Sequence, residues 1–179
     1  MSIYLEEYKF FVPNSEKKLL DIEVRHIFYR SLYMELHLMD GGNYRLFYNF
    51  AIRPNDLVRI MENFVRENSD YSKSSFGDIL ASEGFIKVIR KFQPVVEKII
   101  IEEDVDKLIR LLEKFPLKQS AKKYKSDSDC TYISNIYTEN EGSKYICWRD
   151  IPDEWSALRD IIVILLNYVE DNRGKYSPK

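Results

Sequence analysis

Histidine, cysteine and carboxylate side chains are the groups in this sequence that could carry acid–base or nucleophilic chemistry. The 179 residues contain two histidines and two cysteines, His26, His37, Cys130 and Cys147. Glu35 lies two residues before His37, and a histidine beside a carboxylate is a pairing that a general base can use. Alternate residues on the solvent face of a strand give the same spacing, and the sequence places no nucleophile or oxyanion donor beside them. We therefore expect no catalytic site.

Metal and cofactor motifs give no positive signal either. A transition-metal site needs three or four ligands at characteristic spacings, and the chain has no CxxC or HxxxH. The acidic runs 102–106 and 127–129 lack the glycine and the terminal Glu of a calcium loop. Gly41-Gly42 is not followed by Lys-Thr, so it is not a phosphate loop. We expect no metal and no cofactor, and no disulfide framework from two cysteines.

Charge and hydropathy make several classes of partner and location less favourable. The net charge of −2 does not favour nucleic acid or an anionic membrane surface. The start, MSIYLEEYKFF, lacks the basic residues and long apolar run of a signal peptide. The longest strongly apolar run, 161–166, is far shorter than the ~20 residues of a membrane helix. We expect a cytoplasmic protein with no membrane partner and with both thiols reduced.

The clearest element is a β-hairpin over 31–52. Apolar residues alternate with polar ones on both sides of Asp40-Gly41-Gly42-Asn43. Setting Leu38 opposite Leu46 gives one continuous apolar face, and it requires a three-residue loop, 41–43, with a left-handed Gly or Asn. The predicted apolar face consists of Leu32, Met34, Leu36, Leu38, Leu46, Tyr48, Phe50 and Ile52.

The other elements follow from periodicity and from breaking residues. Helices are predicted near 54–67 and 76–92, from Asp104 as N-cap to Pro116, and over 153–171, the last with an apolar stripe that makes it central. Strands are predicted at 3–12 and as a second hairpin, 130–138 with 144–149. Residues 19–29 fit a strand or a helix, with the strand favoured, and 94–101 fit either. The fold class is α+β, with antiparallel β-hairpins or a meander packed against several α-helices.

We expect a single domain spanning 1–179. The polar segment 118–129 is the place of any internal division. One hairpin and one helix after it are too little to be stable alone, which favours the single domain.

An acidic, aromatic stretch is the strongest candidate for a binding surface. Between Asp127 and Asp160 there are eight acidic and three basic residues, interspersed with Tyr and Trp. Aromatic side chains supply contact area and carboxylates steer a basic partner. A solvated hairpin with ordinary outward carboxylates would look the same. The candidate partner-binding residues are Asp127, Asp129, Tyr132, Tyr137, Glu139, Glu141, Tyr145, Trp148, Asp150 and Glu154. The polar face of the first hairpin, Tyr33, Glu35 and His37, is the second choice.

In size, mild acidity, aromatic content and lack of a catalytic motif, the chain resembles the immunity proteins that bacteria make against polymorphic and contact-dependent toxins. The likeness is one of general type. It implies a protein, monomeric or homodimeric when free, that binds and inhibits a cognate, basic toxin domain, such as a nuclease, by covering its active site or an adjacent surface. Two alternatives stay open: a homo-oligomeric structural or regulatory module, and an enzyme with an unrecognised site.

Overall fold

The computed structural model describes residues 12–26, 30–114, 130–137, 142–148, 151, 153–170 and 176, without the side chains of Pro54, Cys130 and 142–148. These residues fall into two compact units, Met1–Asn49 with Val95–Lys179, and Phe50–Pro94. The strand predicted at 3–12 and the segment 118–129 lie outside the described residues, apart from Val12. The α+β class is confirmed.

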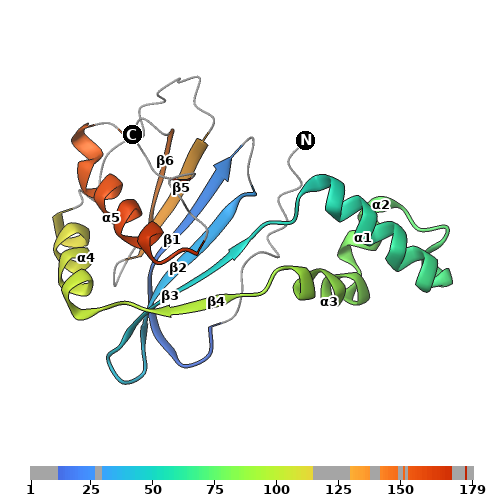
Figure 1. Ribbon diagram of the computed structural model, residues 1–179, viewed down its shortest axis with the longest axis horizontal. Helices are drawn as coiled ribbons and strands as arrows, with labels where there is room; N and C mark the ends of the chain where they lie inside the picture. Colours follow the sequence, from blue (N-terminus) through green and yellow to red (C-terminus); the bar gives the residue numbers. More distant parts are fainter. Residues whose placement is uncertain are drawn as a thin grey trace. The chain divides into compact units, whose positions relative to one another are not determined.

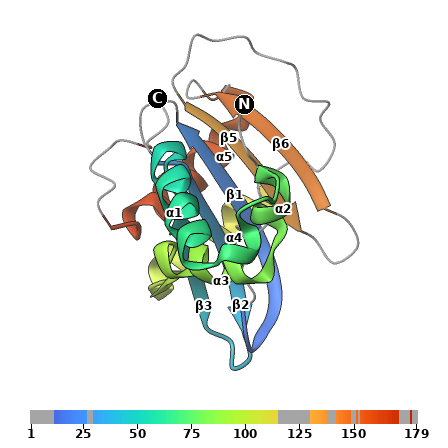
Figure 2. The same cartoon turned by 90° about the vertical axis from the view of Figure 1, so that its right-hand side faces the viewer.

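The first unit is built on one antiparallel sheet, whose six strands run in the order β4-β3-β2-β1-β5-β6 (Figures 1 and 2). Residues 19–26 belong to a strand, and 96–99 within the ambiguous segment 94–101 form the edge strand β4. The strands are β1 (Ser15–His26), β2 (Leu32–Met39), β3 (Tyr44–Phe50), β4 (Val96–Ile99), β5 (Cys130–Tyr137) and β6 (Gly142–Trp148).

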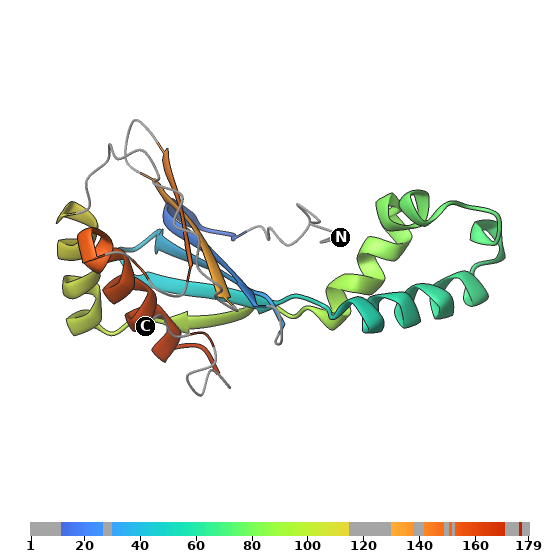
Figure 3. The same ribbon diagram turned by 90° about the horizontal axis from the view of Figure 1, so that it is seen from above.

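Two helices, α4 (Glu102–Lys114) and α5 (Ser156–Asn167), cover one face of this sheet (Figures 1 and 3). A 3₁₀ turn, η3 (Asp153–Trp155), precedes α5, so the α-helix starts later than predicted. It also ends at Asn167, earlier than the predicted end at 171. Ile162 and Leu165 are buried, as the apolar stripe indicated. Beyond the end of α5, the backbone N–H of Glu170 donates to the Tyr48 hydroxyl, which fixes this helix to the sheet.

The helix α4 begins at Glu102, so the prediction of Asp104 as N-cap is wrong. Asp104 lies in the first helical turn, and its backbone N–H donates to the carbonyl of Ile101. Its carboxylate accepts a hydrogen bond from the Tyr168 hydroxyl at 2.7 Å. The acidic residues at this end are thus first-turn residues, which the helix dipole favours.

The first hairpin has the predicted strands, but its turn comes one residue earlier, so the predicted pairing of Leu38 with Leu46 is wrong and Leu36 lies opposite Leu46. The Met39 N–H donates to the Asn43 carbonyl and the Gly42 N–H donates to the Met39 carbonyl, so the loop is 40–42. Gly41 and Gly42 have φ of 105° and 82°, values that residues with a Cβ rarely adopt. The predicted apolar face is buried from Leu32 to Leu36 and at Leu46 and Tyr48, whereas Leu38, Phe50 and Ile52 are half-buried.

The second unit, Phe50–Pro94, is helical. A capping box between Ser75 and Asp78 starts α2, and Ser82 ends that helix and caps the next, which divides the single helix predicted at 76–92. The Phe64 and Phe85 rings, 5.3 Å apart, pack α1 against α3. The elements are α1 (Pro54–Glu67), the 3₁₀ turn η2 (Ser69–Tyr71), α2 (Phe76–Ala81) and α3 (Glu83–Phe92).

Candidate functional site

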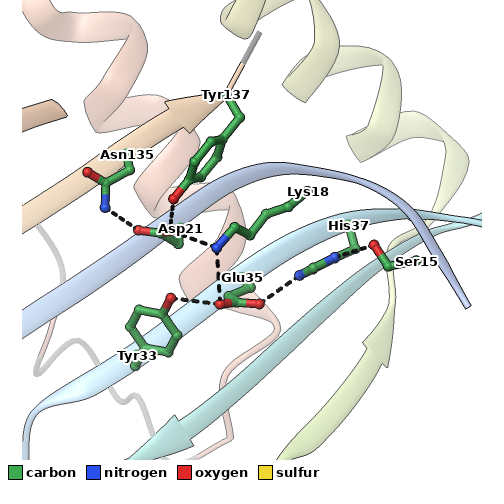
Figure 4. Close-up of polar contacts among 8 residues, drawn as sticks. All are labelled: Ser15, Lys18, Asp21, Tyr33, Glu35, His37, Asn135 and Tyr137. Atoms are coloured by element: carbon green, nitrogen blue, oxygen red, sulfur yellow. Dashed lines mark hydrogen bonds and ion pairs between the residues drawn. The ribbon is translucent and has the colours of Figure 1, made fainter. Parts of the chain in front are cut away.

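Polar side chains gather on the face of the sheet opposite α4 and α5. We call this group the polar cluster; its members are Ser15, Lys18, Asp21, Tyr33, Glu35, His37, Asn135 and Tyr137 (Figure 4). Asp21, Glu35 and His37 are only 3%, 3% and 5% exposed. The expectation that Glu35 and His37 lie on a solvent face is therefore wrong. Burial of carboxylates at this level requires compensating partners, since an unpaired buried charge is strongly destabilising.

Two irregularities in β1 bring the N-terminal members of the cluster to this face. The β1–β2 register shifts between Ser15 and Lys17 and again between Lys18 and Leu20. Side chains of a regular strand alternate every two residues, but each shift adds one residue. Ser15, Lys18 and Asp21, three residues apart, therefore share one face, while Leu20 and the apolar residues after it point to the helices.

Glu35 is the centre of the cluster. Its carboxylate accepts hydrogen bonds from the Tyr33 hydroxyl at 2.7 Å and from His37 Nε2 at 2.7 Å, and Lys18 Nζ lies 3.5 Å away. Burial alone would raise the pKa of Glu35, but the hydrogen bonds from His37 and Tyr33 and the charge of Lys18 hold it below its ordinary value. Glu35 is thus a carboxylate at neutral pH. Burial and the bond to Glu35 raise the pKa of Tyr33.

Asp21 forms the second half of the cluster and joins β1 to β5. Its oxygens accept hydrogen bonds from the Tyr137 hydroxyl at 2.5 Å and from Asn135 Nδ2, and Lys18 Nζ lies 3.2 Å away. Burial and the bond to Asp21 raise the pKa of Tyr137. Burial opposes the charge on Lys18, but Glu35 and Asp21 together raise the pKa of Lys18 above its ordinary value. Lys18 is therefore the cation shared by two buried carboxylates.

A chain of hydrogen bonds runs from Ser15 through His37 to Glu35. Ser15 Oγ lies 2.6 Å from His37 Nδ1, on the opposite side of the imidazole from the Glu35 contact. Because Glu35 is ionised, it fixes the proton on Nε2 and leaves Nδ1 as an acceptor for the Ser15 hydroxyl. A hydroxyl, an imidazole and a carboxylate connected in this order are the groups of nucleophilic acyl transfer. The His37 and Phe47 rings are nearly perpendicular, with ring centroids 5.6 Å apart.

The residues predicted to bind a partner differ in where they lie, and only some of them are described by the structure. Tyr137 belongs to the polar cluster and is half-buried, and Glu154 is exposed in η3. Tyr132 lies on the helix face and is fully buried, with its hydroxyl donating to the Tyr176 carbonyl, so it does not line a surface. Tyr145 and Trp148 lie in β6, and nothing is described of their side chains. Asp127, Asp129, Glu139, Glu141 and Asp150 lie outside the described residues.

Sequence reasoning missed four members of the cluster, Ser15, Lys18, Asp21 and Asn135. Two features of the sequence indicated this site, the alternation Tyr33-x-Glu35-x-His37 in β2 and Tyr137 in the acidic, aromatic stretch. In the strand register, Cys130 and Cys147 are not opposite each other, because Cys147 pairs with Tyr132 across the second hairpin.

Comparison of the chain with models of protein families, with curated proteins and with solved structures found no match. Within the described residues, no helix has the length and apolar character needed to cross a bilayer. The same residues hold no group of three His, Cys, Asp or Glu side chains arranged to bind a metal ion.

Proposed function

We propose that this protein binds and inhibits a partner protein by surface contact, as a toxin-neutralising immunity protein does. The proposed binding surface is centred on Tyr137. The observation that carries the proposal is that Tyr137, a member of the acidic, aromatic stretch, hydrogen bonds to Asp21 within the cluster that also contains Tyr33, Glu35 and His37. The first and second choices for a binding surface thus meet at one place on the sheet.

Pre-organisation favours this surface for binding. The hydroxyls of Tyr33 and Tyr137 each donate to a buried carboxylate, Glu35 and Asp21. Lys18 Nζ lies 4.8 Å from the centroid of the Tyr137 ring, in a cation–π contact. Side chains that are already ordered lose little entropy when a partner binds, and tyrosine is enriched among the residues that dominate binding energy.

The carboxylates that follow Tyr137 in the sequence favour a basic partner. Around the cluster, Lys18, Arg25 and Arg45 stand against Asp21, Glu23, Glu35 and Glu97 on this face, and Lys144 pairs with Asn135 in the ladder. The formal charges of these positions balance with His37 neutral. Two further carboxylates, at 139 and 141, follow Tyr137 closely in the sequence. Local negative charge raises the association rate of a basic protein and makes that rate sensitive to salt.

The test begins with a pull-down from the native organism, which recovers the partner, and continues with a binding and rescue experiment on that partner. Tyr137→Ala is compared with Tyr168→Ala, a matched control on the helix side of the sheet. Both tyrosines are half-buried and donate to a carboxylate, Asp21 at 2.5 Å and Asp104 at 2.7 Å. Both chains are first shown to be folded by thermal melting. Dissociation constants are then measured by calorimetry and growth rescue by co-expression.

Tyr137→Ala should weaken binding by about 30-fold or more, the effect of a residue worth ~2 kcal/mol, and should abolish rescue. Tyr168→Ala should bind as the wild type does. Equal affinities for the two variants would refute the proposed surface. Failure of the wild-type chain to bind or to rescue would refute the inhibitory function itself.

A further inference from the structure

We propose that Ser15 is a nucleophile activated by His37, and that the Ser15–His37–Glu35 chain hydrolyses carboxylic esters with an apolar acyl group. The geometry carries this inference. Ser15 Oγ is 2.6 Å from His37 Nδ1, and His37 Nε2 is 2.7 Å from Glu35 Oε2. Ser15 is half-buried, whereas His37 and Glu35 are buried. The nucleophile is thus accessible while its base and the carboxylate that orients the base are fixed.

The position of Ser15 in β1 supports this role. The preceding residue, Asn14, has φ of 58°, and a register shift follows Ser15 directly. Bulges of this kind occur next to active sites, where they redirect a side chain. The shift leaves Glu16 without a partner in the β1–β2 register, and β5 pairs with β1 only from Leu20 onward.

The side chains around Ser15 and His37 indicate the kind of acyl group that the site would accept. Ser15 pairs with Met39 across β1 and β2. Met39 belongs to a buried apolar cluster with Val12 and Phe47, and the Phe47 ring packs nearly perpendicular to the His37 ring. Apolar neighbours favour a short hydrocarbon acyl chain over a charged one, because burying a charge beside them would cost free energy without compensation.

The reaction proceeds in two balanced steps. Ser15 Oγ attacks the carbonyl carbon while its proton passes to His37 Nδ1. Collapse of the tetrahedral intermediate breaks the bond to the alcohol oxygen, which takes the proton from His37. Water then attacks the acyl-serine ester with His37 again as the base, and the carboxylic acid departs as Ser15 is restored. Glu35 is a positioning residue, because it holds the His37 tautomer and touches no reacting atom.

The first experiment is labelling of the wild-type chain with an alkyl fluorophosphonate, followed by intact mass and peptide mapping. One adduct per chain, on Ser15, is expected. The second is steady-state hydrolysis of p-nitrophenyl butyrate by Ser15→Ala, His37→Gln and Glu35→Gln, each shown to be folded by its melting curve. Ser74→Ala is the control, since Ser74 is a half-buried serine in the other unit.

Ser15→Ala should lose both the adduct and turnover, and His37→Gln should lower kcat by about 10²–10⁴-fold, the usual contribution of a general base. Glu35→Gln should lower kcat with KM unchanged, which a purely structural role would not produce. Ser74→Ala should match the wild type. A folded wild-type chain that acquires no adduct on Ser15, or a Ser15→Ala variant with wild-type turnover, would overturn the assignment.

Discussion

Replacing Lys18 with Met tests the energetic role of the polar cluster most directly. Lys18 Nζ lies 3.2 Å from Asp21 and 3.5 Å from Glu35, and the two carboxylate side chains are only 3% and 4% exposed. Removing one partner of a buried ion pair costs about 3–5 kcal/mol, because a buried charge is left uncompensated. Each carboxylate keeps two hydrogen bonds, and Lys18 itself is 28% exposed. We therefore expect the lower end, about 3 kcal/mol at pH 7.

The assay is urea unfolding followed by fluorescence, with thermal melting alongside. A loss of about 3 kcal/mol corresponds to a fall in Tm of about 6–12 °C for a chain of this length. Lys87→Met is the control, because its ion pair with Glu83 is 3.9 Å long and both side chains are largely exposed. Exposed pairs four residues apart on a helix contribute about 0.3–0.5 kcal/mol, so the control should change stability by no more than about 0.5 kcal/mol.

The effect of Lys18→Met should also depend on pH. The pKa of Glu35 in the folded protein is held below its ordinary value. Ionised Glu35 therefore stabilises the fold at any pH above its ordinary pKa, and this contribution is lost as the pH falls through the folded pKa. Removing Lys18 raises the folded pKa of Glu35. The difference between variant and wild type should therefore be largest at neutral pH and should shrink below about pH 4.3, the ordinary pKa of Glu. A cost under about 1 kcal/mol at pH 7, or one that does not change with pH, would refute this reasoning.

Three further predictions concern the fold. Leu36→Ala removes a side chain that is 1% exposed and should cost roughly 2–5 kcal/mol in urea unfolding; a cost below about 1 kcal/mol would show that the site can collapse without loss. A chain ending at Asp150 lacks α5 and should show no cooperative melting transition by circular dichroism; a sharp transition would contradict the central place of this helix. Gly42→Ala should lower Tm because φ is 82°, whereas Gly77→Ala in α2, where a Cβ meets only Ser75 Oγ at 3.9 Å, should raise stability by about 0.5–1 kcal/mol. Equal effects of the two substitutions would be inconsistent with the backbone argument.

Where the sequence period was unbroken, it predicted the fold correctly. The alternation over 32–38 and 44–50 gave β2 and β3, and the stripe of the C-terminal helix identified Ile162 and Leu165 as core. The ends of the helices were predicted less accurately. Ser82 ends one helix and caps the next, and this local hydrogen bonding is invisible to a hydrophobic period.

The candidate site could be predicted only in part. Glu35 and His37 were visible because β2 is regular, but Ser15 and Lys18 reach the same face through register shifts in β1. A bulge adds one residue to a strand and inverts the faces before it, and no residue type marks its place. Tyr132 was predicted to bind a partner because it is an aromatic residue in an acidic stretch, but it lies in the core.

The strands β3 and β4 pair directly, with Tyr48 opposite Val96, although the whole unit Phe50–Pro94 separates them in the sequence. In topological terms this unit is an insertion between the two arms of a β-hairpin. Doubling the length of such a connection costs only ~0.6 kcal/mol in loop-closure entropy. The length of the insertion can therefore vary greatly without loss of the pairing between β3 and β4.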